Sequence, residues 1–242
     1  SLPRNAFNVG RMLHAAGYVT GCVGKWGLGY SASVGHPNDQ GFDFFYGFLD
    51  HNTAHKYYPN SANAIFRNRS PVPLYGTNYT TDLFDNEARQ FVKRNYTNGP
   101  FFLYLCSTLP HFDMHYPPAG PDSAYANMSW PTIEIMHATM VSELDRSVGR
   151  IMLLIQELGI DENTLVFFSS DNGPHAEDGH SATFFHSSGP LRGIKRDVYE
   201  GGIRVPMLAR WPGMIPANKV SGKVSAFWDV APTLVEVIGA SL

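Results

Sequence analysis

Four short blocks of this sequence carry side chains that could act together on an anionic ester. Asp171 and Asn172 offer the oxygen ligands that hard divalent cations such as Ca²⁺ or Mg²⁺ prefer. Lysines could neutralise a transferring anion, and a histidine could give a proton to its leaving oxygen. The blocks are Gly24-Lys25-Trp-Gly-Leu-Gly29, Leu109-Pro-His111, Ser170-Asp171-Asn172-Gly173 and Leu191-Arg-Gly-Ile-Lys195. Together they predict metal-assisted hydrolysis of a phosphate or sulfate ester.

Each block also has a plain structural alternative. Asn172-Gly173 is a strong hairpin-turn signal, and the glycines around Lys25 would suit a solvated lysine in a turn. His111 could be an exposed loop residue, and His115 is a rival for its role four residues later. The segment from Leu191 to Pro206 carries four basic residues, which favour an anionic substrate but would also suit a solvated loop.

Apolar segments that precede these blocks predict the strands that must position them. Tyr18–Val23 leads into Lys25, Phe101–Cys106 leads into the His111 loop, and Leu165–Ser170 leads into Asp171. Open α/β sheets bind ligands beyond the carboxyl ends of their strands. Helix-then-strand units with continuous apolar strands predict an α/β fold, a largely parallel (mixed) sheet flanked by helices.

Periodicity and breakers predict the remaining elements. Apolar residues recur at helical spacing in residues 5–16, from Thr81 to Val92, in residues 132–158 and in residues 231–238. Residues 205–209 are expected to form a last strand. Residues 27–80 are rich in Gly, Asn, Pro and aromatic residues and are expected to be irregular. We see no internal repeat, and residues 1–242 are expected to form one domain.

Composition fits a globular protein and excludes several functions. Hydrophobic residues make up 43% and charged residues 16% of the 242 residues, and the net charge of −3 gives no basic footprint for nucleic acid. No apolar run is long enough to span a membrane. Cys22 and Cys106 are expected to be free thiols. The four Asn-x-Ser/Thr sequons weakly favour an exported eukaryotic protein, with glycans on Asn68, Asn78, Asn95 and Asn127.

The order of these blocks resembles the sulfatase family, within the alkaline-phosphatase-like superfamily, along almost the whole chain. The resemblance is carried by Ala16-Gly-Tyr-Val-Thr-Gly21 with Gly24-Lys-Trp26, Gly41-Phe-Asp-Phe-Phe-Tyr-Gly47, Phe101-Phe-Leu-Tyr104, Ser170-Asp-Asn-Gly-Pro174, Leu191-Arg-Gly-Ile-Lys195 and Tyr199-Glu-Gly-Gly-Ile-Arg-Val-Pro206. It implies the alkaline-phosphatase-like sulfatase fold and hydrolysis of a sulfate ester.

The resemblance also implies a role for each matching residue. Asp171 and Asn172 match two ligands of a Ca²⁺ that holds the sulfate group. Lys25 and Lys195 match lysines that contact the sulfate. His111, chosen over His115 by its spacing from Phe101, matches the histidine that contacts the sulfate and protonates the leaving oxygen.

Two departures from the family pattern matter. The family has Gly-Lys-Trp-His-Leu-Gly, but this chain has Gly27 in place of that histidine, and we expect His51 or His55 to reach the sulfate pocket in its stead. The Cys/Ser-x-Pro/Ala-x-Arg motif, which yields the family's formylglycine nucleophile, does not occur in the chain. Residues 1–242 are therefore expected to be part of a catalytic domain that lacks the N-terminal nucleophile segment and the C-terminal subdomain. Such a part would bind Ca²⁺ weakly and be inactive by itself.

The family implies the partners and the compartment of the parent protein. We expect a sulfated small molecule or sulfated glycan as substrate and a formylglycine-generating enzyme during maturation. A secreted, periplasmic or lysosomal location is expected. Two alternatives stay open. One is a non-catalytic homologue that binds sulfated glycans, which is consistent with Gly27 in place of the family histidine. The other is a phosphodiesterase or phosphonate hydrolase of the same superfamily.

Overall fold

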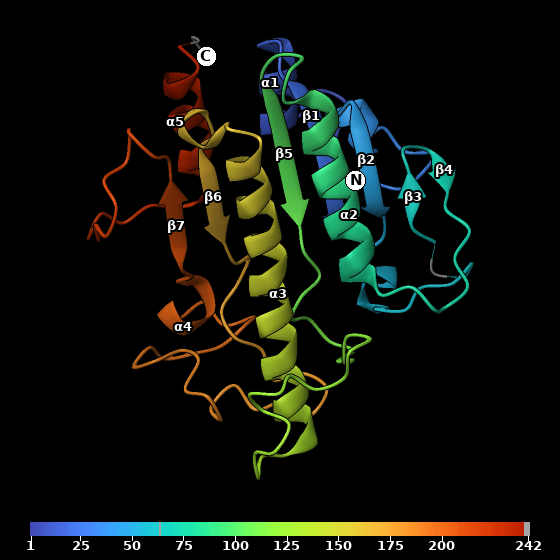
Figure 1. Cartoon of the computed structure of the whole chain (residues 1–242), viewed down its shortest axis with the longest axis vertical. Coiled ribbons are helices and arrows are strands. Elements are labelled where there is room, and N and C mark those ends of the chain that lie inside the picture. Colours follow the sequence, from blue (N-terminus) through green and yellow to red (C-terminus); the bar gives the residue numbers. More distant parts are fainter. Residues whose placement is uncertain (63, 240–242) are drawn as a thin grey trace. The chain divides into compact units, whose positions relative to one another are not determined.

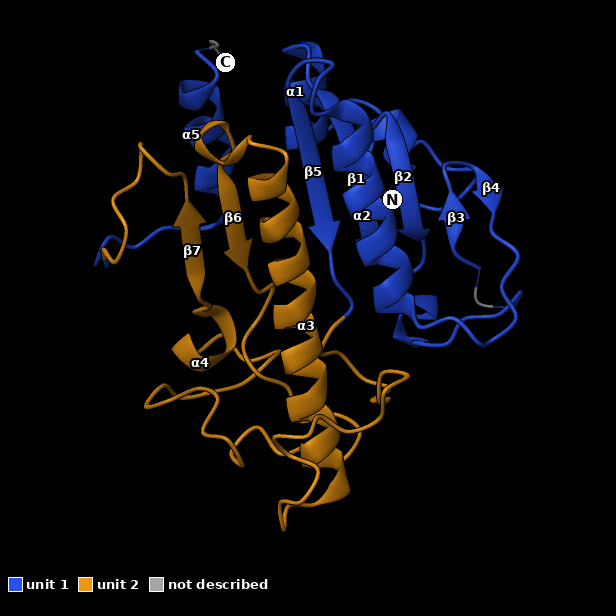
Figure 2. Ribbon diagram, viewed as in Figure 1, with its two compact units in different colours: residues 1–108, 220–242 blue, residues 109–219 orange. Residues whose placement is uncertain are grey.

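The computed structural model describes residues 1–62 and 64–239 of the chain. Its contacts group the chain into two compact units, which Figure 2 shows in different colours. Unit 1 comprises residues 1–108 and 220–242, and unit 2 comprises residues 109–219. The end of the predicted domain, residues 240–242, lies outside the described residues. One domain over residues 1–242 stays a prediction.

Unit 1 is built on a five-stranded sheet with the order β4-β3-β2-β1-β5 (Figure 1). β1 (Val19–Lys25) lies between β2 (Phe44–Phe48) and β5 (Phe101–Cys106) and pairs with both in parallel. β3 (Phe66–Arg67) and β4 (Ser70–Pro71) continue the sheet in antiparallel pairs. Because the three central strands are parallel, the loops that follow them begin at the same edge of the sheet.

Apolar side chains cover both faces of this sheet. Successive residues of a strand point to opposite faces, so Cys22 and Val23 belong to different core clusters. Near-continuous apolar strands of this kind are typical of parallel sheets buried on both sides. The first cluster holds Cys22, Trp26, Phe42, Phe45 and Leu49, and the second holds Val23, Tyr46, Phe48, Ala54, Ile65, Leu74 and Phe84.

Helices pack on this sheet through their apolar faces. α2 (Thr80–Asn95) contacts β1 and β5 and lies in front of the sheet in Figure 1. A Cβ on Gly21 would lie 2.6 Å from the ring of Phe91, so the glycine in β1 lets α2 approach closely. α1 (Val9–Ala15) begins after Asn8, whose side chain accepts a hydrogen bond from the Arg11 N–H at 3.0 Å. Unit 1 also contains α5 (Val230–Val237) and the 3₁₀ turns η1 (Pro37–Gln40), η2 (Thr53–His55) and η4 (Phe227–Asp229).

Unit 2 contains one long helix and a pair of antiparallel strands. α3 (Thr132–Glu157) is followed by η3 (Asp161–Asn163) and β6 (Val166–Ser169), which pairs with β7 (Met207–Arg210). Asp161 accepts two hydrogen bonds from the Arg210 guanidinium, at 2.6 and 2.8 Å, and so joins the start of β6 to the end of β7. The short helix α4 (Glu200–Ile203) precedes β7. β6 ends two residues before Asp171.

The structure confirms the predicted α/β class with a mixed, mostly parallel sheet flanked by helices. Both cysteines are free, as predicted. The prediction that residues 27–80 are irregular is wrong, because β2 runs through the centre of the sheet there. Among the described residues, no helix is both long and apolar enough to span a bilayer.

Candidate functional site

Lys195 and His111 meet in unit 2, although 84 positions separate them in the sequence. Nζ of Lys195 lies 2.9 Å from Nε2 of His111. An ammonium has only donors, so Nε2 of the imidazole must accept this hydrogen bond. Nδ1 of His111 lies 2.8 Å from the carbonyl oxygen of Phe112, which can only accept, so Nδ1 carries the proton. The arrangement therefore fixes a neutral His111 with its lone pair on Nε2, facing Lys195.

A carboxylate, Glu177, completes the surroundings of the lysine. Its Oε2 accepts a hydrogen bond from Nζ of Lys195 at 2.9 Å, and its Oε1 lies 2.5 Å from the guanidinium of Arg196. Burial would raise the pKa of the Glu177 carboxyl, but the hydrogen bonds and charges of Lys195 and Arg196 hold that pKa below its usual value. Glu177 is thus an ionised partner of the lysine.

Asp171 and Asn172 lie on the loop that follows β6, at the carboxyl end of that strand. The Asn172 amide donates from Nδ2 to the Gly173 carbonyl at 2.8 Å, which leaves Oδ1 as the atom suited to a cation. A Cβ on Gly173 would lie 1.9 Å from the carbonyl oxygen of Gly201, so only glycine fits where this loop packs on α4. The backbone N–H of Lys195 donates to the Pro174 carbonyl at 2.8 Å, which joins the lysine loop to the Asp-Asn loop.

Asp171 and Asn172 are the predicted ligands of a cation. Their hard oxygen atoms fit Ca²⁺ or Mg²⁺, but Ca²⁺ takes six to eight oxygen ligands. Across residues 1–62 and 64–239, no group of three or more His, Cys, Asp or Glu side chains is arranged to hold a metal. The assignment of Asp171 and Asn172 as ligands stays a prediction.

Unit 1 carries the other predicted site residues, Lys25, His51 and His55. Lys25 ends β1 and is half-buried, and the two histidines follow β2, so all three lie at the same edge of the sheet. Gly27 has a φ of +73°, and its N–H donates to the Leu49 carbonyl at 3.1 Å. A Cβ on Gly27 would lie 3.7 Å from Cβ of His51. The His51 side chain therefore starts next to the place where a side chain at position 27 would start.

Three histidines of unit 2 form a buried cluster that the sequence did not reveal. The ring centroid of His137, on α3, lies 3.9 Å from that of His180 and 5.6 Å from that of His175. Nδ1 of His180 lies 2.6 Å from Oε2 of Glu134, and both side chains are almost fully buried. Nε2 of His175 lies 3.3 Å from the Pro110 carbonyl, next to His111. This cluster therefore adjoins the His111 loop within unit 2.

Two signals in the sequence could have found part of this network. Glu134 and His137 lie one helical turn apart, and polar side chains on the core side of a long helix need partners. His175 and Glu177 come directly after the Asp-Asn block. By contrast, His115 lies on the surface, with Nδ1 3.1 Å from the Asp113 carbonyl.

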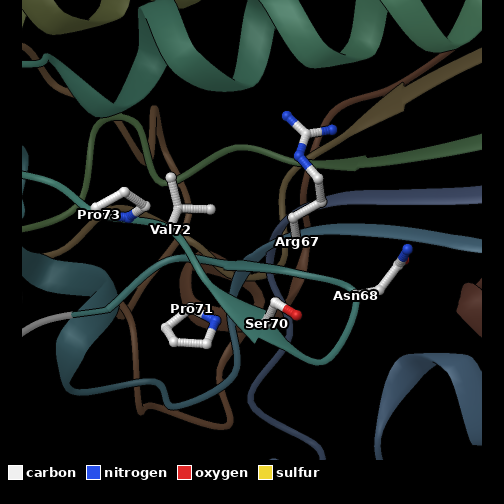
Figure 3. A pocket seen from close by; sticks show the side chains of 6 residues that line it. All are labelled: Arg67, Asn68, Ser70, Pro71, Val72 and Pro73. Atoms are coloured by element: carbon white, nitrogen blue, oxygen red, sulfur yellow. The ribbon is translucent and has the colours of Figure 1, made fainter.

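A hollow of about 460 Å³ lies at the β3–β4 hairpin of unit 1 (Figure 3). Its charged lining residue, Arg67, donates to Glu87 at 2.9 Å and stacks over the ring of Tyr46. None of the proposed catalytic or metal-binding residues lines this hollow. Its remaining walls are formed by Asn68, Ser70, Pro71, Val72 and Pro73.

The four sequon asparagines differ in their surroundings. Asn78 and Asn127 are exposed. Asn68 is half-buried, and its Oδ1 accepts from the Phe45 N–H at 2.9 Å and from the Asn38 amide at 3.3 Å. Asn95 donates from Nδ2, the atom that would carry a glycan, to the Phe91 carbonyl at 2.8 Å. Glycosylation at each of the four stays a prediction.

The comparison with known proteins agrees with this architecture. The family model described as Sulfatase matches residues 1–240. Mouse (Mus musculus) arylsulfatase G is 31% identical over 283 residues, which cover 100% of this chain and 51% of the relative. N-acetylgalactosamine-6-sulfatase of the dog, Canis lupus familiaris, is 34% identical over 242 residues, which cover 94% of this chain and 44% of the relative.

A solved structure is similar over nearly the whole chain. The crystal structure of Ps i-CgsB in complex with k-i-k-neocarrahexaose matches with a TM-score of 0.85 and 30% identity, over 99% of this chain and 55% of that one. The chain belongs to the sulfatase family. It spans about half the length of the curated relatives it matches.

Proposed function

We propose that the protein is a sulfuric ester hydrolase that cleaves a sulfate ester to an alcohol and sulfate with the help of a divalent cation, Ca²⁺. The observation that carries this proposal is the contact between Lys195 and Nε2 of His111, on loops bonded to the Asp171–Asn172 segment of a sulfatase-family chain. A positive group beside an imidazole suits an anionic sulfate ester. The ammonium can neutralise charge on the sulfuryl oxygens, and the imidazole, once protonated, can give a proton to the leaving oxygen, which becomes more negative as the bond breaks.

Lys195 can bind the sulfate without losing its contact to the imidazole. Of its three N–H donors, one goes to His111 and one to Glu177 among the described residues, so the third can reach a sulfate oxygen. Lys25 is proposed to contact the sulfate as well. His111 must first take up a proton on Nε2 before it can give one to the leaving oxygen, because Nε2 carries a lone pair in this arrangement.

Asp171 and Asn172 are proposed to hold the cation through their side-chain oxygens. The bound cation would neutralise part of the negative charge of the sulfate and fix the orientation of the sulfate group. The nucleophile is proposed to be a formylglycine supplied from outside residues 1–242 and made by a formylglycine-generating enzyme. Residues 1–242 would then bind the cation weakly and turn nothing over by themselves.

His51 is proposed to take the place of the histidine that the family has at position 27, and His55 is its rival. The separation of 3.7 Å between Cβ of His51 and the position that a Cβ on Gly27 would occupy supports His51. With His51→Ala and His55→Ala in the full-length protein, we expect the larger loss of turnover for His51→Ala. A larger loss for His55→Ala would move the role to that residue.

The substrate is proposed to be a sulfated small molecule or a sulfated glycan. N-acetylgalactosamine-6-sulfatase acts, by its name, on a sulfated sugar, and the Ps i-CgsB structure holds a neocarrahexaose. We further propose that the protein is exported, to the medium, the periplasm or a lysosome. The sequons permit this location.

The proposal is tested on the full-length protein co-expressed with a formylglycine-generating enzyme. Release of a chromogenic phenol from an aryl sulfate, and of sulfate from a panel of sulfated sugars, is measured with and without Ca²⁺. We expect turnover that depends on Ca²⁺ and is lost in Lys195→Ala but kept in Lys219→Ala, a matched change of an exposed lysine in the same unit. No turnover of any ester, with formylglycine confirmed by mass spectrometry, would refute the proposal.

The second candidate function is a non-catalytic protein that binds sulfated glycans. Gly27 favours it, because the histidine that the family has there is absent. In that case the same panel would show binding of sulfated sugars that weakens in Lys195→Ala, and no release of sulfate.

A further inference from the structure

The carboxylate of Glu177 lies between two cations that are neighbours in the sequence. Its side chain is 12% exposed, and that of Lys195 is 16% exposed, whereas the Arg196 side chain is 72% exposed. An ion pair in water contributes little, whereas a pair withdrawn from water is screened much less. The Glu177–Lys195 contact is therefore the stronger constraint of the two, and it acts on the lysine that contacts His111.

A lysine needs such a constraint more than an arginine does. Its ammonium sits on a flexible four-carbon stem and can rotate freely about its last bond. Nε2 of His111 accepts a hydrogen bond from only one of the three N–H donors of Lys195. Without a second fixed acceptor, Nζ could turn towards water and leave the imidazole. The Oε2 atom of Glu177, 2.9 Å from Nζ, is that acceptor.

Glu177 is itself held in place by the loop that carries His111. The N–H of Glu177 donates to Nδ1 of His175 at 3.1 Å. Nδ1 therefore accepts, so Nε2 of His175 carries the proton and donates to the Pro110 carbonyl, 3.3 Å away. His175 thus bridges the backbone of Glu177 to the residue that precedes His111. The carboxylate of Glu177 and the imidazole of His111 are therefore held in place relative to each other through His175.

We propose that Glu177 is a positioning residue that keeps the Lys195 ammonium against Nε2 of His111. The inference rests on the proposed function, because it assigns Glu177 to the site of the proposed sulfatase. Glu177 also lowers the net positive charge of that site, so it does not serve to attract the sulfate. Its role is geometric, and a displacement of about 1 Å in a catalytic group can reduce turnover by about 100-fold.

This assignment predicts a separation between kcat and KM. Glu177→Gln keeps the size of the side chain but removes the charge, so Lys195 loses its ionic partner while the site becomes more positive. We expect kcat to fall by about 10- to 100-fold while KM for the sulfate ester stays the same or falls. A residue that served only to bind substrate would instead raise KM at constant kcat.

The experiment uses the full-length protein, with formylglycine confirmed, as wild type, Glu177→Gln, Glu177→Asp and Glu87→Gln. Glu87 is the matched control, because it is also 12% exposed and also pairs with two basic residues, Arg67 and Arg94, but on α2 in unit 1. We expect Glu87→Gln to keep kcat within about twofold. Glu177→Asp, which keeps the charge on a shorter side chain, should recover part of the lost kcat. Equal losses of kcat in both glutamine variants, or a rise in KM alone for Glu177→Gln, would overturn the proposal.

A second readout does not depend on turnover. In protein labelled with ¹⁵N-histidine, with the His111 signal assigned through His111→Gln, the wild type should show a protonated Nδ1 and an unprotonated Nε2. In Glu177→Gln we expect the Nε2 signal to move towards that of an imidazole nitrogen that accepts no hydrogen bond from Lys195, while Nδ1 keeps its proton on the Phe112 carbonyl. An unchanged Nε2 signal in that variant would refute the positioning role even if no sulfate ester is hydrolysed. Absent turnover in the wild type would instead refute the proposed function alone.

Discussion

The buried imidazole of His137 should make the folded protein sensitive to acid. Both of its ring nitrogens are buried and have no hydrogen-bond partner in residues 1–62 and 64–239. Burial, and then the nearby His180 and His175, lower the pKa of His137 from its ordinary value of 6.5 to about 3. The ring is therefore neutral in the folded state at any pH above about 4, whereas the unfolded chain takes up a proton below 6.5.

The direction and the size of the effect follow from this difference in pKa. A histidine whose pKa is lowered by folding contributes stability that is present above the unfolded pKa and is lost as the pH falls towards the folded pKa. Each pH unit below 6.5 removes about 1.4 kcal/mol. Between pH 7 and pH 5 the free energy of unfolding should therefore fall by about 2 kcal/mol from this one side chain.

Urea unfolding of the full-length protein at pH 7 and pH 5 measures this loss. His137→Phe keeps an aromatic ring among His180, His175 and Phe185 but cannot be protonated. We expect the loss of stability between the two pH values to be about 2 kcal/mol smaller in His137→Phe than in the wild type. At pH 7 the variant should be little affected, because the buried ring nitrogens it removes make no hydrogen bond.

The control is His14→Phe, which changes a histidine whose side chain is 55% exposed and lies 3.2 Å from Asp43. The loss of stability between pH 7 and pH 5 should be smaller in His137→Phe than in this variant. If His137→Phe and the wild type lost the same stability between pH 7 and pH 5, the reasoning from burial would be refuted.

Two further predictions concern loops and sequons. Gly173→Ala should destabilise unit 2 by about 1–3 kcal/mol, because the added Cβ would lie 1.9 Å from the Gly201 carbonyl oxygen. The variant should also lose its stabilisation by Ca²⁺ in thermal unfolding, since the loop that carries Asp171 and Asn172 would shift. An unchanged Ca²⁺ response would contradict this. In protein secreted from eukaryotic cells, mass spectrometry should find higher glycan occupancy at the exposed Asn78 and Asn127 than at the half-buried Asn68. Higher occupancy at Asn68 than at the two exposed sites would contradict this.

The strands and helices that the sequence predicted well have strong local signals. β5 was predicted with its observed bounds, because Asn98-Gly-Pro100 marks its start and its six residues are apolar or aromatic. α2 and α3 follow the predicted 3.6-residue periodicity to within one residue at each start. α1 starts later than predicted, at Val9, because the side chain of Asn8 caps it.

β2 could not be recognised because its burial comes from distant parts of the chain. Its five residues, Phe44–Phe48, contain a glycine and lie among Asn, Pro and Gly residues that are typical of loops. A Cβ on Gly47 would lie 1.8 Å from the Gly24 carbonyl oxygen, so this glycine permits the close contact with β1. Only the neighbouring strand shows why a glycine is needed in a strand there.

The candidate site residues were chosen by type and block, and the sequence could not show which of them are in contact. The sequence places Lys195 and His111 in separate loops, and only the fold brings Nζ within 2.9 Å of Nε2. His137 and His180 were missed because their pairing depends on a segment of irregular structure that folds back onto α3. Periodicity predicts which face of a helix is buried, but not which loop covers it.

The basic block around Lys195 shows why counting charges gives an incomplete prediction. Its four basic residues favoured an anionic substrate, yet the structure pairs Lys195 and Arg196 with Glu177. Arg204 lies 3.4 Å from Glu200, and the guanidinium of Arg192 lies 3.8 Å from the ring centroid of Tyr199. The block therefore presents less net positive charge than the sequence suggests. In the proposed site, selectivity for an anion then depends on where the Lys195 ammonium is held, and we propose that the carboxylate of Glu177 sets that position.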